Sequence, residues 1–353
     1  MFVIASRIAS SSRSYSERTC PLISQWRSTL RASAATTLHD YRVFITRFIT
    51  WRQDGIAEEQ GRRAGKSPTT ATLKDLTRDL ISLWVRALEK TRSERFADRR
   101  VLSTKTVITH RAALSAFCSW LVERELLTAN PCAKAYRPKI PKSDPVYMNR
   151  KQWRLFLEES EAYDLERADE LAAKPFADTT FWIFLVATGA TTYSEGCIVR
   201  PADVHVDEDP TSNMVRVYLK GTKTANRTRD VWISRSVADR VLAWARRYGR
   251  GHFEHIFHFK RNCGYHFFRK VCDRLVARGY PDFEAFNPYT LRHTYAVNMI
   301  QGDPERNMPG VDIVTLARLM GHGDNIQTTM IYAKHVGDYA ARGCRVMHEA
   351  LGL

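Results

Sequence analysis

Three residues near the C-terminus have the types and spacing to perform one kind of chemistry. Arg292 lies at the start of a predicted helix, His322 follows 30 residues later directly after a glycine, and Tyr332 comes 10 residues after that. A guanidinium binds phosphate through paired, charge-assisted hydrogen bonds. An imidazole can donate a hydrogen bond near neutral pH, and a tyrosine hydroxyl can act as a nucleophile. The pattern indicates a site that cleaves phosphodiesters through a covalent tyrosine intermediate.

The charge of the chain is concentrated in its first part. The 353 residues carry a net charge of +16. Residues 1–150 hold 27 Lys and Arg against 13 Asp and Glu, whereas residues 151–353 hold 27 against 25. A strongly cationic domain attracts polyanions, so DNA or RNA is the expected partner. A basic surface that serves only solubility is the alternative on charge alone.

Cysteine usage and hydropathy limit the remaining classes of protein. The seven cysteines are scattered and form no Cys-x-x-Cys pair, which argues against a disulfide framework and a zinc site. Cys263, His266 and Cys272 could be imagined as metal ligands, but we expect no metal and no other cofactor. No apolar run approaches the roughly 20 residues of a membrane helix, so we expect no membrane partner. Residues 1–33 are predicted to be disordered or arm-like; a weak organelle transit signal is the alternative.

Hydrophobic periodicity predicts a helical N-terminal domain over residues 34–135. Apolar residues recur every three or four positions over 37–53 and 73–90, and again from about Ser103. Residues 54–70 are polar and predict a loop. The third helix should end before Asn130-Pro131, a plausible terminator.

A proline-rich linker is predicted over residues 136–146. The stretch Tyr136–Pro145 holds three prolines and three cations in ten residues, and proline removes backbone donors and fixes the chain. The remainder, 147–353, is predicted to be one domain with a C-terminal tail. It should contain a helix over 150–163 and a buried apolar run over 179–190.

Alternating apolar residues predict a β-hairpin in this second domain. Val215, Val217 and Leu219 alternate with polar neighbours, and a basic turn leads to a second short strand at 231–233. From Ser236 onward the pattern is again mainly helical. The fold class is therefore mainly α with a small β-hairpin or sheet: an N-terminal all-helical domain followed by an α/β domain.

In order and spacing, these motifs resemble the tyrosine recombinases, the phage integrase family, over roughly residues 147–340. The resemblance implies a core-binding (DNA-binding) domain at 34–135 and a catalytic domain at 147–353. It implies that Tyr332 is the nucleophile and that Arg292 and His322 bind the scissile phosphate. The family's usual histidine three positions before the arginine is Tyr289 here, and a phenol does not readily exchange protons near neutral pH.

The basic turn of the hairpin resembles the family's turn whose lysine protonates the leaving 5′-hydroxyl. Lys223 is the first candidate and Lys220 the second. General acid catalysis of this kind contributes roughly a hundredfold to ten-thousandfold. Phosphate contacts without catalysis are the alternative role for these lysines.

The first motif departs from the family pattern Thr-Gly-x-Arg-x-x-Glu. The chain continues from Gly189 to Glu195 without an arginine, so the arginine position is occupied by Thr192, or by Thr191 in the other alignment. Losing one preorganised donor typically costs about 2.7–4 kcal/mol of transition-state stabilisation, which implies reduced turnover unless another cation substitutes. Arg200 is one candidate, although on a continuous helix it would lie about 80° around from Thr192; Arg227 and Arg229 on the hairpin are others.

The resemblance predicts a site-specific DNA recombinase that acts through a 3′-phosphotyrosyl intermediate. The expected partners are double-stranded DNA recombination sites, further copies of the chain as a tetramer on two sites, and DNA-bending accessory proteins. The expected location is the cytoplasm or nucleoid, or the nucleus or an organelle in a eukaryotic host. The alternatives are a catalytically impaired DNA-binding accessory protein of a mobile element and a type IB topoisomerase-like enzyme. The residues predicted to contact DNA are basic: Lys105, Arg111, Arg137, Lys139, Lys142, Arg227 and Arg229.

Overall fold

The computed structural model divides into two compact units, Met1–Lys142 and Ser143–Leu353. The division falls inside the proline-rich stretch 136–146. The residues that the structure describes are 21–30, 35–59, 73–92, 101–140, 144–206, 208, 211–221, 227–259, 261–303, 306, 308–323, 325–335, 347–348 and 351.

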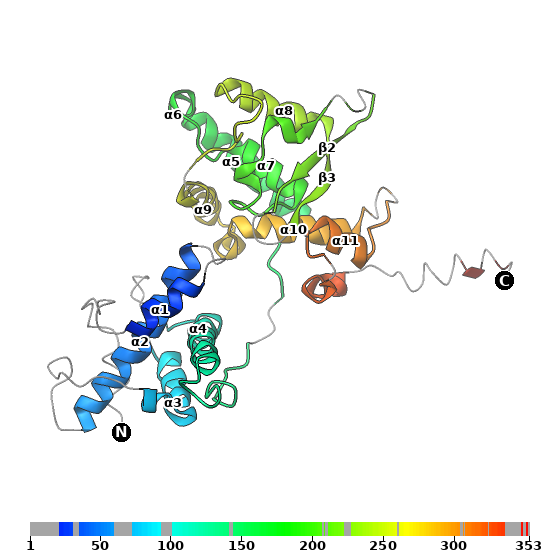
Figure 1. The fold of residues 1–353 in the computed structure, drawn as a ribbon. Helices are drawn as coiled ribbons and strands as arrows, with labels where there is room; N and C mark the ends of the chain where they lie inside the picture. The colour runs from blue at the N-terminus through cyan, green and yellow to red at the C-terminus, as the bar shows by residue number, and fades with distance from the viewer. Residues whose placement is uncertain are drawn as a thin grey trace. The chain divides into compact units, whose positions relative to one another are not determined.

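In the described part of the first unit the regular elements are helices (Figure 1), apart from an isolated bridge between Arg92 and Val101. Ser103 caps the N-terminus of one helix by accepting a hydrogen bond from the backbone of Thr106, and Thr77 caps another through Leu80. Such caps satisfy backbone donors that the first helical turn leaves free. The elements are α1 (Pro21–Thr29), α2 (Ala35–Glu59), a 3-10 turn η3 (Leu73–Asp75), α3 (Arg78–Glu89) and α4 (Thr104–Glu123).

Helix α4 lies at the centre of this unit, because α1, α2 and α3 all pack against it. Aromatic side chains fill the shared core: Trp26 packs edge-on against Phe117, and Phe48 packs edge-on against Trp84. Burial of aromatic rings of this size provides much of the packing energy of such a core. The predicted helical unit is confirmed.

Three local expectations for this unit were wrong. Residues 21–29, expected within a disordered or arm-like segment, form α1, because Ile23 and Trp26 are buried in the core. Helix α2 continues through residues 54–59, which were expected in a loop. The helix expected over 73–90 is broken before Arg78, where Thr77 takes an extended conformation as the N-cap. Residues 1–20 lie outside the described part.

The second unit combines a three-stranded antiparallel sheet with helices (Figure 1). The main elements are α5 (Arg150–Glu166), α6 (Ala168–Ala173), α7 (Thr179–Thr188), β1 (Val204–His205), β2 (Met214–Leu219), β3 (Arg229–Ser234), α8 (Arg235–Arg247), α9 (Arg261–Ala277), α10 (Pro288–Gln301) and α11 (Ile313–Leu319). The 3-10 turns are η4 (Gly196–Ile198), η5 (Pro201–Asp203), η7 (Pro281–Ala285), η9 (Ile326–Thr328) and η10 (Met330–His335).

The predicted hairpin is confirmed as β2 and β3, with Val217 paired to Val231. Alternate residues of β2 are buried, as a sheet with one face on the core requires. Strand β1 pairs with β2 through Val204; its two residues are too short a run to give a periodic signal. At its turn end, β3 lies against α11, where Arg229 contacts Leu319.

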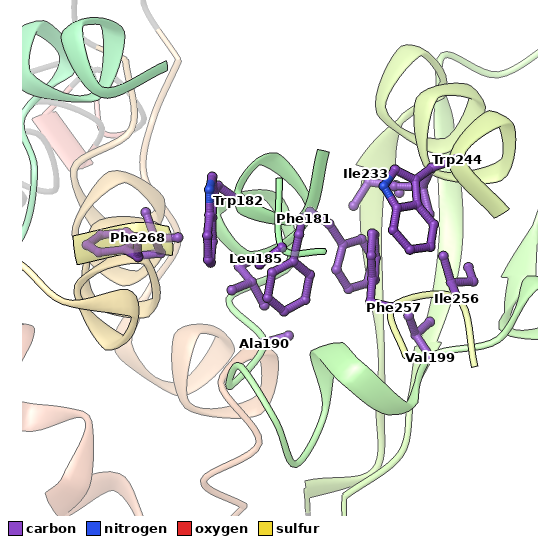
Figure 2. Close-up of a cluster of buried hydrophobic side chains, with 14 of the residues drawn as sticks. Phe181, Trp182, Leu185, Ala190, Val199, Ile233, Trp244, Ile256, Phe257 and Phe268 are labelled. Atoms are coloured by element: carbon purple, nitrogen blue, oxygen red, sulfur yellow. The ribbon is translucent and has the colours of Figure 1, made fainter. Parts of the chain in front are cut away.

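Helix α7 is apolar on all sides and forms the middle of the second core (Figure 2). Phe181 packs against Phe257, and Trp182 packs edge-on against Phe268 of α9. The helix ends at Gly189, whose φ of 63° favours glycine. A Cβ at Gly189 would lie 2.4 Å from the ring of Tyr295 on α10. This close approach brings the first motif against the helix that carries Arg292.

Candidate functional site

Arg292 is held inside the protein by the first turns of α10. Asn287 and Thr290 form a capping box at the start of this helix, and Pro288 occupies its first position. Arg292 is 1% exposed. Its Nη1 donates to the Gly189 carbonyl at 2.6 Å, and its Nη2 donates to the Met320 carbonyl. Arg292 therefore joins α10 to the first motif and to the loop after α11.

Glu195 is the carboxylate around which the arginines of this site gather. Its Oε atoms lie 3.1 Å and 3.3 Å from the guanidinium of Arg229 and 3.4 Å from Arg292 Nη1. Arg227 Nη1 lies 3.8 Å from Glu195 Oε1, and the backbone N–H of Thr191 donates to Oε2 at 2.8 Å. Burial alone would raise the pKa of Glu195, but the Arg229 and Arg292 cations outweigh it and hold the pKa below its usual range. The carboxylate is thus ionised at neutral pH.

Arg229 connects the hairpin to this carboxylate and to α11. Its side chain is 6% exposed. Besides Glu195, it donates from Nε to the Leu319 carbonyl at 2.5 Å and from Nη1 to the Arg227 carbonyl at 2.9 Å. The guanidinium is therefore occupied by protein acceptors, which differs from the DNA contact predicted for it. Arg227 is the more accessible of the two, with 24% of its side chain exposed.

The residue before His322, Gly321, must be a glycine because of its backbone conformation and its surroundings. Its φ is +66°, and a Cβ there would lie 2.9 Å from Arg229 Nη1 and 3.1 Å from Arg227 Cα. Only a residue without a side chain fits this conformation at this distance from the hairpin. The loop after α11 can therefore lie directly on the hairpin arginines.

His322 lies between Arg292 and Thr329. Its Nε2 is 3.3 Å from Arg292 Nη2, and its Nδ1 is 2.8 Å from Thr329 Oγ1. Arginine can only donate, so Nε2 accepts in this arrangement and Nδ1–H donates to the hydroxyl. Burial, with help from Arg292, Arg227 and Arg229, lowers the pKa of His322 to about 4. The imidazole is neutral at physiological pH and accepts a hydrogen bond from Arg292.

Tyr332 is buried on η10, with 2% of its surface exposed. Its hydroxyl lies 2.6 Å from Nδ1 of His293. Burial and the nearby Tyr289 raise the pKa of Tyr332 above its ordinary value, although Arg292 opposes the shift. The phenol is therefore protonated at neutral pH and must lose its proton to become a strong nucleophile.

His293 is the site residue that sequence reasoning missed. It follows Arg292 directly on α10, and its ring contacts Tyr332 on η10. Tyr289, one helical turn earlier, packs edge-on against its ring with centroids 4.9 Å apart and is itself 47% exposed. The one available signal was its place beside Arg292 in the motif. Nothing in the spacing alone tells which of two adjacent residues faces the tyrosine.

The structure separates Arg200 from this group of residues. Residues between Thr192 and Arg200 form turns and η4 rather than a continuous helix, so the helical relation between the two positions was a wrong premise. Within the described part, no hydrogen bond or ion pair joins Arg200 to Glu195 or Arg292. Arg200 lies instead near His255 and Asp203. Thr192 itself is buried.

The structure describes one of the two lysine candidates. Lys220 directly follows β2 and is half-exposed, with its Nζ 3.9 Å from Asp203 Oδ1. Lys223 lies outside the described residues. The role of each stays a prediction.

The predicted DNA contacts of the first unit are in part surface residues. Lys105, Arg137 and Lys139 are exposed. Arg111 instead donates to the backbone carbonyls of Cys132, Ala135 and Tyr136, so its guanidinium holds the end of the helical unit together. Lys142 lies outside the described residues.

Two features are absent from the described residues. No cluster of three or more His, Cys, Asp and Glu side chains there has the geometry of a metal site. None of the helices in that part is both long and apolar enough to cross a membrane.

Comparison with known proteins gives a consistent set of relatives. No family model matches the chain. The chain is 28% identical over 284 residues to the tyrosine recombinase XerC of Corynebacterium efficiens, covering 78% of this chain and 80% of the relative. It is 27% identical over 306 residues to the tyrosine recombinase XerC of Xanthomonas axonopodis pv. citri, covering 86% and 87%.

Solved structures share the fold at lower identity. The Tn1549 transposon integrase, in complex with a circular intermediate DNA, superposes with a TM-score of 0.60 at 17% identity, covering 93% of this chain and 98% of the integrase. The XerH site-specific recombinase, bound to its difH substrate, gives a TM-score of 0.57 at 14% identity, covering 88% and 80%. Both have the fold of this chain.

The contacts of Glu195 predict a stability defect when its charge is removed. In Glu195→Gln, the buried guanidinia of Arg229 and Arg292 lose their counter-charge, and breaking a buried pair on one side costs about 3–5 kcal/mol. We expect a loss of that size in denaturant unfolding at neutral pH, against less than about 0.5 kcal/mol for the exposed Glu161→Gln control.

The pH dependence of the same comparison has a defined sign. Because the folded pKa of Glu195 is depressed below 4.5, its stabilisation is complete above pH 4.5 and is lost as the pH falls through the folded pKa. Wild type and Glu195→Gln should therefore converge in stability in acid. A difference that is small at neutral pH, or that persists unchanged in acid, would contradict this role for Glu195.

Proposed function

Because the chain is similar to tyrosine recombinases along most of its length, we propose that it is a member of that family and a site-specific DNA recombinase that cuts and rejoins DNA through a 3′-phosphotyrosyl intermediate. The observation that carries the proposal is the assembly of one site from three distant segments. Arg292 on α10 donates to His322 after α11, and the adjacent His293 contacts the hydroxyl of Tyr332 on η10.

In the proposed reaction, the oxygen of Tyr332 attacks the scissile phosphorus and the bond to the 5′-oxygen breaks. Arg292 holds a non-bridging oxygen, and His322 holds another once its proton has moved to Nε2, with Nδ1 then accepting from Thr329. Lys223 or Lys220 protonates the leaving oxygen. The 5′-hydroxyl of a partner strand then attacks the phosphotyrosine and releases Tyr332. The covalent link keeps the energy of the phosphodiester bond, so the cycle needs no ATP.

One donor of Arg292 supports the phosphate-binding role. Its two Nη groups have acceptors in Gly189, Glu195, Met320 and His322, but its buried Nε has no hydrogen-bond partner among the described residues. A buried donor without a partner is costly, and such groups call for an explanation such as a ligand. A phosphate oxygen would supply the missing acceptor.

Arg227 is our proposal for the cation that replaces the absent first-motif arginine. It lies within 3.8 Å of Glu195 and close enough to His322 to help lower the pKa of that imidazole. Arg229 is already bound to three protein acceptors, and Arg200 belongs to the group near Asp203. Arg227 thus combines a position at the site with a partly exposed guanidinium. Turnover would be reduced to the extent that this replacement is imperfect.

The basic first unit is proposed to bind DNA mainly through phosphates, with an affinity that falls steeply with salt. Lys105, Arg137 and Lys139 are the exposed described candidates for these contacts. A tetramer on two recombination sites, exchange of the C-terminal tail between subunits, and DNA-bending accessory proteins complete the proposal. In a bacterial host the enzyme would act at the nucleoid.

The nucleophile can be tested with a nicked duplex that carries the recombination site found in repeats flanking the gene. Cleavage beside the nick releases a short fragment and traps the covalent adduct. Wild type should form an adduct that migrates slowly in denaturing gels, and Tyr332→Phe should form none while DNA binding is retained. The exposed Tyr265→Phe on α9 is the matched control. Tight binding without an adduct in wild type would favour the accessory protein, and relaxation of any supercoiled plasmid would favour the topoisomerase.

The replacement arginine can be tested by single-turnover cleavage of the same DNA. Arg227→Ala should lower the rate by about a hundredfold to a thousandfold, the usual effect of losing one preorganised donor. Arg227→Lys should recover only part of it, because an ammonium lacks the planar fork. A larger loss in Arg200→Ala than in Arg227→Ala would reverse the assignment.

A DNA with sulfur in place of the bridging 5′-oxygen can identify the general acid, because a thiolate leaves without needing a proton. Lys223→Ala should cleave normal DNA about a hundredfold to ten-thousandfold more slowly and the sulfur-containing DNA at nearly the wild-type rate. If Lys220→Ala shows this rescue instead, Lys220 is the acid. Rescue of neither variant would leave both lysines with phosphate contacts alone.

A further inference from the structure

The hydroxyl of Tyr332 is in direct contact with one titratable side chain. Nδ1 of His293 lies 2.6 Å from the phenolic oxygen, and among the described residues no other hydrogen bond or ion pair involves either group. A separation of 2.6 Å is short for a hydrogen bond between a nitrogen and an oxygen. The nucleophile therefore rests against a possible proton acceptor.

The surroundings of His293 keep its ring neutral. Tyr289 from the preceding turn, Arg292 beside it and Tyr332 from η10 are the titratable or charged groups that face it. No described carboxylate faces the ring, so nothing there stabilises an imidazolium in the resting protein. Burial and the adjacent Arg292 lower the pKa of His293 to about 4. A neutral imidazole with its proton on Nε2 offers a lone pair on Nδ1 to the tyrosine hydroxyl.

The other candidates for a proton acceptor are less suitable. His322 has its Nε2 lone pair directed at Arg292 and its Nδ1 at Thr329. Tyr289, which stands where the family has a histidine, packs with its ring against His293. Lys220 lies beside Asp203, and a lysine cation has no lone pair to offer.

Resting on the proposed recombinase function, we propose that His293 is the general base that removes the proton from Tyr332. As the phenolic oxygen forms its bond to phosphorus, its proton passes to Nδ1, which leaves an imidazolium beside the phosphotyrosine. The bond between phosphorus and the 5′-oxygen breaks, and the lysine acid supplies the proton for that oxygen. In the reverse step, the imidazolium returns its proton to the tyrosine oxygen as the phosphotyrosine bond breaks.

The proposal differs from a role in which His293 only holds the tyrosine in place. A base must accept a proton, whereas a holding group needs only a hydrogen bond. An asparagine can place a polar group near the position of Nδ1, but it cannot accept a proton at these pH values. Asparagine and alanine at position 293 therefore separate the two roles.

The test is single-turnover adduct formation by the full chain on the nicked duplex, measured between pH 6 and 9. These limits are about two units above the folded histidine pKa and one unit below an ordinary phenol. In wild type His293 is already deprotonated throughout, so the rate should be nearly independent of pH. Both His293→Ala and His293→Asn should be slower at pH 7 by about a hundredfold to ten-thousandfold. Their rates should rise about tenfold per pH unit, because only the small phenolate fraction then reacts.

Further measurements distinguish a general base from a positioning residue. Free imidazole should accelerate His293→Ala by partly filling the vacated space, whereas the exposed His266→Ala on α9 should behave as wild type. A His293→Asn variant with nearly wild-type rate, or variants that are slow but as pH-independent as wild type, would overturn the base assignment and leave a positioning role. Absence of any adduct in wild type would instead remove the recombinase function itself. DNA binding and a cooperative unfolding transition in each variant show that the chain has folded.

Discussion

The second unit depends on one buried carboxylate and the arginines around it. Glu195 brings together the segment after α7, the hairpin through Arg229, and α10 through Arg292. Removing a carboxylate and two guanidinia from water is costly, and such a cluster is tolerated only when the charges pair and the remaining donors find acceptors. Here the backbone carbonyls of Gly189, Leu319 and Met320 accept most of those donors, and among the described residues Arg292 Nε is the exception. The electrostatic requirement of the cluster therefore fixes where three loops must lie, and these loops carry the candidate site.

This arrangement gives a physical meaning to the departure from the family's first motif. The motif's glutamate is retained, but Thr192 stands where an arginine is expected. Two hairpin arginines now lie beside the carboxylate, one buried and saturated and the other partly exposed. In the proposed site, positive charge near the phosphate would thus come from a different element. The location of a cation in space matters more than its location in the sequence, because a phosphate is stabilised by any donor within hydrogen-bond distance.

Much of the fold could be predicted from periodicity and turn residues, but the contacts between elements could not. The hairpin followed from the alternation of Val215, Val217 and Leu219, and α7 from an apolar run with no polar face. Arg292, His322 and Tyr332 could be singled out because a motif preserves their order. The ends of α2 and the presence of α1 were missed because burial of Trp26 against other helices decides them. Similarly, no spacing rule predicts that Arg227 reaches Glu195 or that His293, rather than its neighbours, faces Tyr332.

The burial of Tyr332 sets the chemical problem that its neighbours must solve. A phenol in an apolar cluster with Tyr295 and Met320 is protected from solvent and has a raised pKa, which lowers the fraction of phenolate at neutral pH. Burial also removes water that would hydrolyse a covalent intermediate. The proton must leave the phenol as the attack proceeds, and among the described residues the side chain in contact with its oxygen is His293. A neutral imidazole is suited to this, since it can accept the proton in one step and return it in the next.

The low pKa of His293 weakens it as a base but also makes its imidazolium a strong acid for restoring the phenol. A reaction that must run equally well in both directions needs a group that is adequate in each role, and the developing negative charge of the phosphate would raise the basicity of the imidazole during attack.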